Sequence, residues 1–542
     1  MRGLMMDYQL TIPTILRRAE TLFGKKEIIS RLPDKSIHRY TYKEFVLRTK
    51  KLSNALHQLG IRHGDRVATL CWNHYQHLEA YFAVPCMGSI VHTLNLRLSP
   101  DDLTYIINHA EDKIIIVDQV LLPLLEKFKS NINVQQIIVI PNGNLPVPEG
   151  YLNYEEVVAS GDGSKFEPFE GDEYTGASMC YTSGTTGKPK GVLYSHRSIL
   201  LHAVGCMMNC TGVGMAEQDV ALPIVPMFHA SAWGFPFSCT FSGATQVFPG
   251  PYLDAESLLQ LYESEKVTVT GGVPTVMLGV LNKLDEDPKK YKLCLRVALI
   301  GGSAVPRFLI KAFDERYQIK VVQGWGMTET SPVASSSPIG SALQNAQKEE
   351  QYDYQAKQGL PLPFVEIRGR NENGIIPWDG VTMGELEVRG PWISSSYYRD
   401  LEPEGKFTSD EWFKTGDIVT IDQQGCIEVK DRSKDVIKSG GEWISSVALE
   451  NTLMGHPAVL EAAVIAVPDE KWMERPFAYV VPKVGKALTG AELKEFLESK
   501  FPRFWLPEGY EIVQTIPKTS VGKFLKSALR DRYAKDRSSS KV

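Results

Sequence analysis

The chain has 542 residues, several times the length of a usual domain, so two or more domains are expected. Hydrophobic residues make up 43% and charged residues 23%, which is the composition of an ordinary globular protein. The net charge of −5 argues against nucleic-acid binding, because proteins that bind nucleic acids usually carry a basic excess.

The chain shows no apolar run of the about 18–20 residues that a membrane-spanning helix needs. Its first segment, Met1 to Phe23, mixes polar and charged residues with apolar ones and lacks the apolar core of a secretory signal. We therefore expect a cytoplasmic protein with at most peripheral membrane contact. Of the eight scattered cysteines, Cys206 and Cys210 stand at helical spacing, and we predict buried thiols there, not a zinc site or a disulfide.

The first half of the chain alternates predicted helices and strands. Thr41-Tyr42-Lys43-Glu44 is a capping box that opens a helix ending near Gly60, and Ser99 to Asp102 starts another helix with Pro100 in its first turn. Further on, Pro306 to Arg316 is predicted to be helical. The predicted strands are Val67 to Trp72, Lys113 to Val117, Gln136 to Ile140, Arg296 to Ile300 and Ile319 to Gln323. This alternation predicts a largely parallel α/β sheet with ligands at the strand ends.

The pattern changes in the last third of the chain. Gln344 to Lys357 is predicted to be an exposed helical insertion, and short strands with turns dominate after Gly384. The last ~110 residues are enough for a small separate domain. The polar run Asp431 to Asp435 is the best boundary between the two parts.

The strongest local pattern is the string YTSGTTGKPKG, from Tyr181 to Gly191. Its glycines let the backbone approach a ligand, its hydroxyls donate hydrogen bonds and its two lysines bring positive charge, as a polyphosphate site requires. It is not a P-loop, because Pro189 follows Gly187-Lys188 and Thr182 stands where the first glycine should be. The alternative interpretation is a flexible surface loop.

A second pattern, GWGMTET, follows a predicted strand. Gly324 and Gly326 would let a nucleotide lie flat against the backbone, and Trp325 could stack on a base. Thr328 could bind a phosphate oxygen, and Glu329 supplies the hard oxygen ligand that Mg²⁺ prefers. Taken alone, the string is explained as well by a turn at a strand end.

Two more ionisable groups stand in predicted turns. Asp417, in the string KTGD, could accept hydrogen bonds from both hydroxyls of a ribose. Lys523 stands in PKTSVGK near the C-terminus, where a lone lysine is usually a solvated surface residue.

The strings YTSGTTGKPKG, GWGMTETSP, KTGD, DRSKDVIKSGGEWIS and PKTSVGK, in this order, resemble the adenylate-forming superfamily of acyl-CoA synthetases, luciferases and peptide-synthetase adenylation domains. The resemblance covers essentially the whole chain. Within that superfamily the chain most resembles bacterial long-chain fatty acyl-CoA synthetases, through HLEAYFAVPCMGSIVHTLNLRLSP, PMFHASAWGFP, GPWISSSYY and KSGGEWISSVALENTLMGHP. Trp325 departs from the commoner tyrosine at its position, a change that preserves stacking.

The resemblance implies a role for each residue of these strings. The ATP phosphates would be held by Thr182, Ser183, Gly184, Thr185, Thr186, Gly187, Lys188 and Lys190. The adenine would lie between Gly302, Ser303 and Ala304 on one side and Gly324, Trp325 and Gly326 on the other, with Met327 and Thr328 in the same nucleotide site. Asp417 and Arg432 would bind the ribose, and Thr185 and Glu329 would lie near Mg²⁺. Lys523 would reach the α-phosphate and the substrate carboxylate, and Lys434 would be the pivot of a hinge.

The stretch from Pro226 to Trp233 is apolar and aromatic around His229, and its rings could be ordinary core. In the subgroup that the chain resembles, the residue matching His229 lies near the carboxylate, and the residue matching Trp233 gates a tunnel for the fatty tail. Gly234 would leave room for that gate to swing. An apolar tunnel suits a long alkyl chain, since each buried CH₂ contributes about 0.8 kcal/mol.

The resemblance predicts an α/β fold. It has a large N-terminal domain (1–430) of several subdomains, with parallel-type sheets and a small β-barrel-like part. A hinge (431–436) and a small mobile α/β lid (437–542) follow. The expected function is an ATP-dependent fatty acid–CoA ligase for medium to long chains, which forms an acyl-AMP with Mg²⁺ and releases pyrophosphate and AMP. The expected partners are fatty acid, ATP, CoA and a second copy of the chain, joined through the N-terminal region. A ligase for an aryl or branched acid, an adenylation module that loads a carrier protein and an inactive binding relative remain as alternatives.

Overall fold

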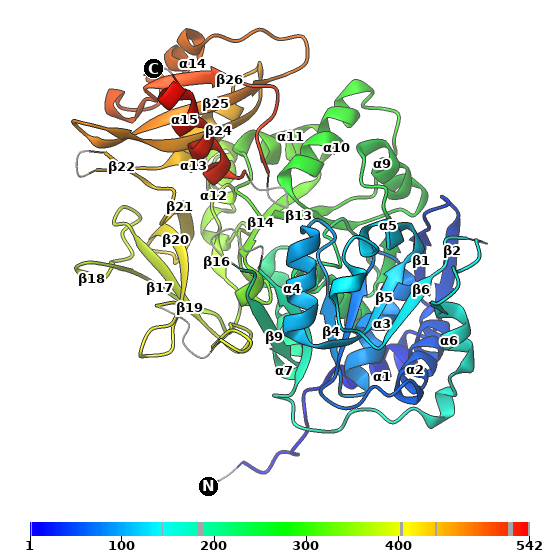
Figure 1. The fold of residues 1–542 in the computed structure, drawn as a ribbon. Coiled ribbons are helices and arrows are strands. Elements are labelled where there is room, and N and C mark those ends of the chain that lie inside the picture. Colours follow the sequence, from blue (N-terminus) through cyan, green and yellow to red (C-terminus); the bar gives the residue numbers. More distant parts are fainter. Residues whose placement is uncertain are drawn as a thin grey trace.

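The computed structural model describes residues 1, 3–143, 145–182, 188–400, 405–439, 442–518 and 524–539. Two α/β sheets form the body drawn in blue to green in Figure 1. A yellow antiparallel sheet borders this body, and the orange and red C-terminal elements lie beyond it at one end of the molecule. The predicted α/β class is confirmed.

The first sheet has nine strands in the order β16-β15-β14-β13-β12-β10-β11-β1-β2. The six strands from β14 to β1 in this order run parallel, and the outer pairs are antiparallel. Their bounds are β1 Glu27–Arg31, β2 Ile37–Thr41, β10 Val220–Pro223, β11 Thr245–Phe248, β12 Val269–Gly272, β13 Val297–Gly301, β14 Lys320–Gly326, β15 Val333–Ser336 and β16 Leu360–Pro361.

The second sheet has seven strands in the order β7-β6-β5-β3-β4-β8-β9, parallel except for the β8–β9 hairpin. Its interior strand β5 is buried on both faces, as its near-continuous apolar sequence requires. The bounds are β3 Arg66–Leu70, β4 Ile90–Thr93, β5 Asp112–Asp118, β6 Gln136–Ile140, β7 Leu152–Asn153, β8 Gly176–Tyr181 and β9 Gly191–Ser195.

Two smaller sheets follow in the sequence. The third has the antiparallel order β18-β17-β19-β20-β21 and corresponds to the predicted barrel-like part. Its strands are β17 Glu366–Asn371, β18 Gly374–Ile375, β19 Gly384–Arg389, β20 Phe413–Ile421 and β21 Ile427–Arg432. The C-terminal sheet has the order β23-β22-β25-β24, with β26 beside β25, and its strands are β22 Ile437–Ser439, β23 Glu442–Ile444, β24 Val459–Asp469, β25 Met473–Pro482 and β26 Gly509–Ile512.

Helices connect and cover these strands. They are α1 Ile12–Leu22, α2 Tyr42–Gln58, α3 Tyr75–Cys86, α4 Pro100–Ala110, α5 Leu122–Leu125, α6 Tyr154–Ser160, α7 His196–Met207, α8 Phe235–Ser242, α9 Ala255–Ser264, α10 Pro274–Glu286, α11 Arg307–Tyr317, α12 Lys348–Gln355, α13 Ser446–Met454, α14 Gly490–Glu498 and α15 Lys526–Ser539. The predicted capping box is present at α2, where Thr41 and Glu44 satisfy each other's backbone N–H groups.

One predicted element differs in its environment. The stretch expected to be an exposed insertion contains α12, but one face of this helix is buried. The hydroxyl of Tyr352 donates to Asp314 Oδ2 at 2.7 Å, and the amide of Gln355 donates to the carbonyl of Val321 at 3.0 Å. Because this stretch is rich in charged residues, its sequence did not indicate a buried face. That face packs α12 against α11 and β14.

Candidate active site

The predicted phosphate string connects β8 to β9, at one edge of the seven-stranded sheet. Two hydrogen bonds join the residues next to these strands. The Thr182 N–H donates to the Lys190 carbonyl at 2.9 Å, and the Lys190 N–H donates to Thr182 Oγ1 at 3.1 Å. The predicted residues Ser183, Gly184, Thr185, Thr186 and Gly187 lie outside the described residues.

Both lysines of the string contact aromatic rings. Lys188 Nζ lies 4.9 Å from the centre of the Tyr105 ring, and Lys190 Nζ lies 4.8 Å from that of Tyr397. Lys190 also pairs with Asp400 Oδ2 at 2.8 Å. The two lysines therefore bring positive charge to the end of the string just before β9, as a polyphosphate site requires.

The predicted adenine strings lie side by side at the ends of two parallel strands. Gly301 ends β13 and pairs with Gly324 in β14, and Gly302 follows with φ of 83°. A Cβ on Gly301 would lie 2.4 Å from the carbonyl oxygen of Gly324, and a Cβ on Gly326 would lie 1.7 Å from that of Pro332. The close approach of backbone segments therefore requires both glycines. From the sequence, Gly326 was expected to serve the nucleotide alone, and Gly301 had no predicted role.

The structure brings the three predicted ribose and base residues together. Trp325 Nε1 donates to Asp417 Oδ2 at 2.9 Å, and Arg432 Nε pairs with Asp417 Oδ1 at 2.8 Å. Asp417 is only 2% exposed. The prediction of a turn here is wrong, because Asp417 lies inside β20, next to Gly416 with φ of 75°, where the pairing of β19 with β20 is irregular.

Glu329 lies in a short 3₁₀ turn, η6 (Thr328–Thr330), after β14. It is 8% exposed, and its Oε1 accepts a 2.7 Å hydrogen bond from the hydroxyl of Tyr397. The carbonyl of Thr328 accepts a 2.7 Å hydrogen bond from the hydroxyl of Tyr194 in β9. This hydrogen bond connects η6, which follows β14 of the nine-stranded sheet, to β9 of the seven-stranded sheet. Strand β9 is the strand that follows the phosphate string.

Gly301, Gly302, Gly324 and Gly326, at the ends of β13 and β14, form an edge that is called the glycine edge below. An apolar pocket lies beside this edge. Its lining residues are Cys206, Thr211, Val213, Met215, Trp233, Phe235, Ser238, Leu299, Val333, Ser336 and Leu362. Trp233 borders both regions: its ring atoms lie 3.2 and 3.7 Å from the Cβ positions built on Gly301 and Gly302. His229 lies half-buried, one residue before the turn that carries Trp233.

This turn, η5 (Ala230–Gly234), has an unusual backbone. Four successive non-glycine residues, Ala230 to Trp233, have φ between 42° and 55°, a region that costs L-residues free energy. Gly234 continues the turn with φ of 80°, and a Cβ there would lie 2.7 Å from the ring of His202. The structure therefore gives Gly234 a steric reason of its own, while its effect on the motion of Trp233 stays a prediction.

The predicted hinge is flanked by contacts with the C-terminal helices. Asp431 accepts hydrogen bonds from the backbone N–H of Ser446 at 2.7 Å and from its hydroxyl at 2.6 Å. Arg530 of α15 pairs with Asp435. Lys434, which lies between Asp431 and Asp435 in the sequence, is exposed. Lys523, the predicted catalytic lysine, lies outside the described residues.

Sequence reasoning missed Tyr397 and Asp400. The signal for Tyr397 was the string GPWISSSYY, which had served to indicate a subgroup and not a role, and Asp400 lies two residues beyond this string. The predicted burial of two cysteines is also corrected, because Cys206 is partly buried on the pocket wall and Cys210 is exposed. Cys210 is exposed because it falls in a short 3₁₀ turn (Asn209–Thr211) beyond the end of α7.

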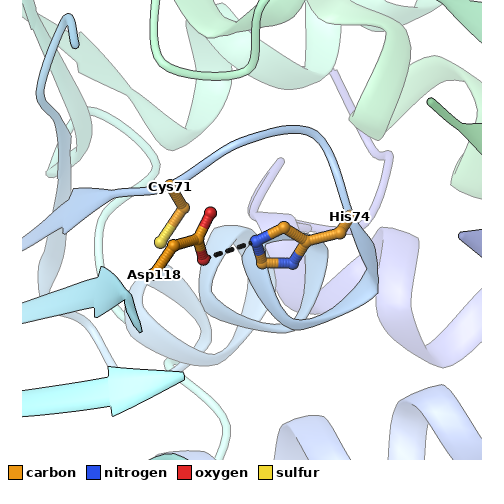
Figure 2. A group of neighbouring side chains, drawn as sticks. All are labelled: Cys71, His74 and Asp118. Atoms are coloured by element: carbon orange, nitrogen blue, oxygen red, sulfur yellow. Dashed lines mark hydrogen bonds and ion pairs between the residues drawn. The ribbon is translucent and has the colours of Figure 1, made fainter. Parts of the chain in front are cut away.

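A buried group of Cys71, His74 and Asp118 lies at the ends of β3 and β5 (Figure 2). His74 Nδ1 accepts the N–H of His77 at 3.3 Å, so Nε2 carries the proton and donates to Asp118 Oδ1 at 2.7 Å. A metal at Nε2 would move that proton to Nδ1, against the N–H of His77. The geometry therefore favours a hydrogen-bonded cluster in which His74 caps α3, and it argues against a metal centre.

The fold and this site define an adenylate-forming enzyme. Residues 16–398 match the family described as AMP-binding enzyme, and residues 448–523 match the AMP-binding enzyme C-terminal domain. The chain therefore belongs to the AMP-binding enzyme family.

Similar proteins match over nearly the whole chain. The long-chain-fatty-acid–CoA ligase of Thermus thermophilus is 48% identical, over 98% of this chain and 96% of the relative. The medium-chain-fatty-acid–CoA ligase of Ectopseudomonas oleovorans is 40% identical, over 98% of each chain. A solved structure of an anthranilate CoA ligase in complex with anthranoyl-AMP superposes with a TM-score of 0.87 and 26% identity, over 99% of this chain and 100% of that one. Among the described residues, no helix is both long and apolar enough to cross a bilayer.

Proposed function

We propose that this protein is an ATP-dependent fatty acid–CoA ligase that forms an acyl-AMP and transfers the acyl group to CoA. The observation that carries this proposal is the position of Trp233, which walls an apolar pocket and also lies against the glycine edge predicted to hold the nucleotide. An acid bound with its tail in this pocket would present its carboxylate to a nucleotide at that edge.

The chemistry explains why such a site needs positive charge. A carboxylate is a poor acyl donor, so it first attacks the α-phosphorus of ATP, forms a mixed anhydride and expels pyrophosphate. Negative charge builds on phosphorus in this step, and Lys188, Lys190 and Lys523 are proposed to stabilise it. The thiol of CoA then attacks the anhydride carbonyl, and AMP leaves.

Mg²⁺ is part of the proposal. Glu329 fits a magnesium ligand, because a buried carboxylate with one oxygen fixed by a hydrogen bond keeps a hard oxygen for the metal. Thr185 would be its second protein contact. When bound, Mg²⁺ would neutralise charge on the phosphates.

The apolar lining favours a medium to long alkyl chain, with His229 near the carboxylate and Trp233 as the gate. A ligase for an aryl or branched acid is the second candidate, since a solved relative binds anthranoyl-AMP. An adenylation module that loads a carrier protein would share the nucleotide residues and differ in the acceptor. We also propose a cytoplasmic homodimer whose C-terminal domain, from residue 437, moves as a lid about residues 431–436.

A panel of acids tests this function. Purified protein is incubated with ATP, Mg²⁺, CoA and one acid at a time, from butyrate to stearate with benzoate and isobutyrate, and AMP and thioester are quantified. The proposal expects the highest kcat/KM for a straight chain of about eight carbons or more, because each buried CH₂ adds about 0.8 kcal/mol. A preference for benzoate or isobutyrate, or AMP release without thioester, would replace it by one of the other candidates.

A further inference from the structure

Tyr397 lies in the segment that connects β19 to β20, outside the two α/β sheets. Its side chain is 5% exposed and packs in the same core cluster as Val192 and Tyr194 of β9. Its ring also contacts Phe407 edge-on, at 6.1 Å between centres. A phenol enclosed on several sides is held in one position.

The hydroxyl of Tyr397 determines how Glu329 is presented. It donates to Oε1 at 2.7 Å. A second contact, from the backbone N–H of Ser394 to the carbonyl of Glu329 at 2.8 Å, ties the same segment to the backbone of η6. Among the described residues, none donates a hydrogen bond to Oε2 of Glu329. One carboxylate oxygen is therefore fixed, and the other is left for a ligand.

The same segment also holds the phosphate string. Lys190 lies over the ring of Tyr397 and pairs with Asp400, and the backbone N–H of Tyr398 donates to the carbonyl of Gly191 at 2.8 Å. Tyr397 thus contacts both a lysine predicted to bind phosphate and a carboxylate predicted to bind the metal. These two groups come from different sheets, and the ring and hydroxyl of one side chain join them.

We propose that Tyr397 is a positioning residue for the metal–phosphate site: its hydroxyl orients Glu329 toward Mg²⁺, and its ring supports Lys190. This inference rests on the proposed function. It assigns to Tyr397 a role that neither the sequence patterns nor the similar proteins supply. A carboxylate that is already oriented loses less conformational freedom on binding a metal, so removing the hydroxyl weakens metal binding even where the fold is intact.

Binding of Mn²⁺, a paramagnetic substitute for Mg²⁺, tests the proposal without any turnover. Free Mn²⁺ is measured by electron paramagnetic resonance during titration of the protein saturated with a non-hydrolysable ATP analogue. Tyr397→Phe is expected to weaken Mn²⁺ binding by about tenfold, in the range seen when a ligand's hydrogen-bond partner is removed. Tyr398→Phe is the matched control, because its ring faces His109 and Arg399, and it should bind Mn²⁺ as the wild type does.

A second measurement separates positioning from damage to the fold. The affinity for the analogue in the presence of a chelator should be nearly unchanged in Tyr397→Phe, whereas a misfolded site would lose it. Wild-type Mn²⁺ affinity in Tyr397→Phe, together with lost affinity in Glu329→Gln, would overturn the role of Tyr397 alone. Failure of the wild type to bind Mn²⁺ with the analogue would instead overturn the magnesium site of the proposed function, and this inference with it.

Discussion

The carboxylate of Asp417 meets two donors, the indole of Trp325 and the guanidinium of Arg432, one on each oxygen. Each carboxylate oxygen has a second lone pair, so both can still accept a ribose hydroxyl. A tyrosine, the commoner residue in the resembling family, has no N–H at the position of the indole nitrogen. In addition to its predicted stacking on the base, Trp325 orients the carboxylate that is expected to bind the ribose.

Trp325→Phe tests this role. The substitution keeps an aromatic face and removes the N–H that holds Asp417, so the KM for ATP should rise by about tenfold, because a hydrogen bond to a charged group contributes about 1.5 kcal/mol. The KM for the acid should hardly change. Trp378→Phe, at an exposed tryptophan of the same chain, is the control for loss of an indole. Equal ATP KM values for wild type and Trp325→Phe would contradict the assignment.

Trp233→Ala tests the gate. Because the indole walls the pocket and its backbone is strained, its removal should broaden or shift the preferred chain length and leave ATP affinity nearly unchanged. If Trp233 were ordinary core, the variant would lose several kcal/mol of stability instead, as large-to-small core substitutions do. Melting curves measured beside the acid panel distinguish the two. An unchanged chain-length profile with a large fall in Tm would favour the core interpretation.

Buried histidines make stability depend on pH. Burial lowers the pKa of His202 and His77 to about 3 and that of His196 to about 4. The unfolded chain therefore binds protons first as the pH falls. Stability is complete above the unfolded pKa of about 6.5 and is lost progressively toward pH 4, by about 1.4 kcal/mol per histidine at pH 5.5.

His202→Gln isolates one of these contributions. The glutamine oxygen can still accept the N–H of Val333, the present partner of His202 Nε2, but it does not titrate. Chemical denaturation at pH 7.5 and 5.5 should therefore show a smaller loss of stability in the variant than in the wild type, by about 1.4 kcal/mol. The same loss in both proteins would show that His202 is not neutral in the fold.

At the scale of elements, the sequence predicted what local chemistry determines. The capping box of α2 and the apolar run of β5 formed as expected because their signals lie within a few residues. Asp417 was assigned to a turn because glycine and aspartate favour turns, but its pairing with Arg432 of β21 makes it part of a strand. The burial of α12 depends on partners in α11 and β14, which no local pattern reveals.

The candidate site likewise contains residues that local sequence indicates and residues that only distant contacts reveal. Dense strings indicated the residues that are predicted to bind phosphate, base and ribose, since glycine, hydroxyl and charge occur there at short spacing. Tyr397 and Asp400 could not be assigned from the chain alone. Their roles arise from contacts with Glu329 and Lys190, 68 and 210 positions away in the sequence.

The predicted hinge, residues 431–436, is the element whose motion the proposed mechanism requires. Proline fixes φ near −65° and restricts the residue before it, so Lys434→Pro should hold one orientation of the C-terminal domain. We expect the adenylation orientation to persist. The variant should then release pyrophosphate at a near-normal rate and form little thioester, with Lys434→Ala as the control for loss of the amine. Full thioester formation by Lys434→Pro would place the pivot elsewhere.

In the whole molecule, one predicted nucleotide edge would serve two reactions. Two α/β sheets carry the residues predicted to contact phosphate, base and acyl chain, while the C-terminal part carries the remaining predicted catalytic group, Lys523. Contacts at Asp431 and Asp435 bind the C-terminal helices to the predicted hinge from both sides. Because the same edge would serve both reactions, adenylation must be complete before CoA takes part.

Exchange of labelled pyrophosphate into ATP tests this requirement most directly. In the absence of CoA, a fatty acid such as decanoate should drive the exchange in the wild type, because acyl-AMP formation is reversible. Lys523→Ala should lose the exchange and still convert pre-made acyl-AMP and CoA to the thioester, because its charge is needed only where the carboxylate meets the α-phosphate. Exchange that depends on CoA, or none with any fatty acid, would contradict the account.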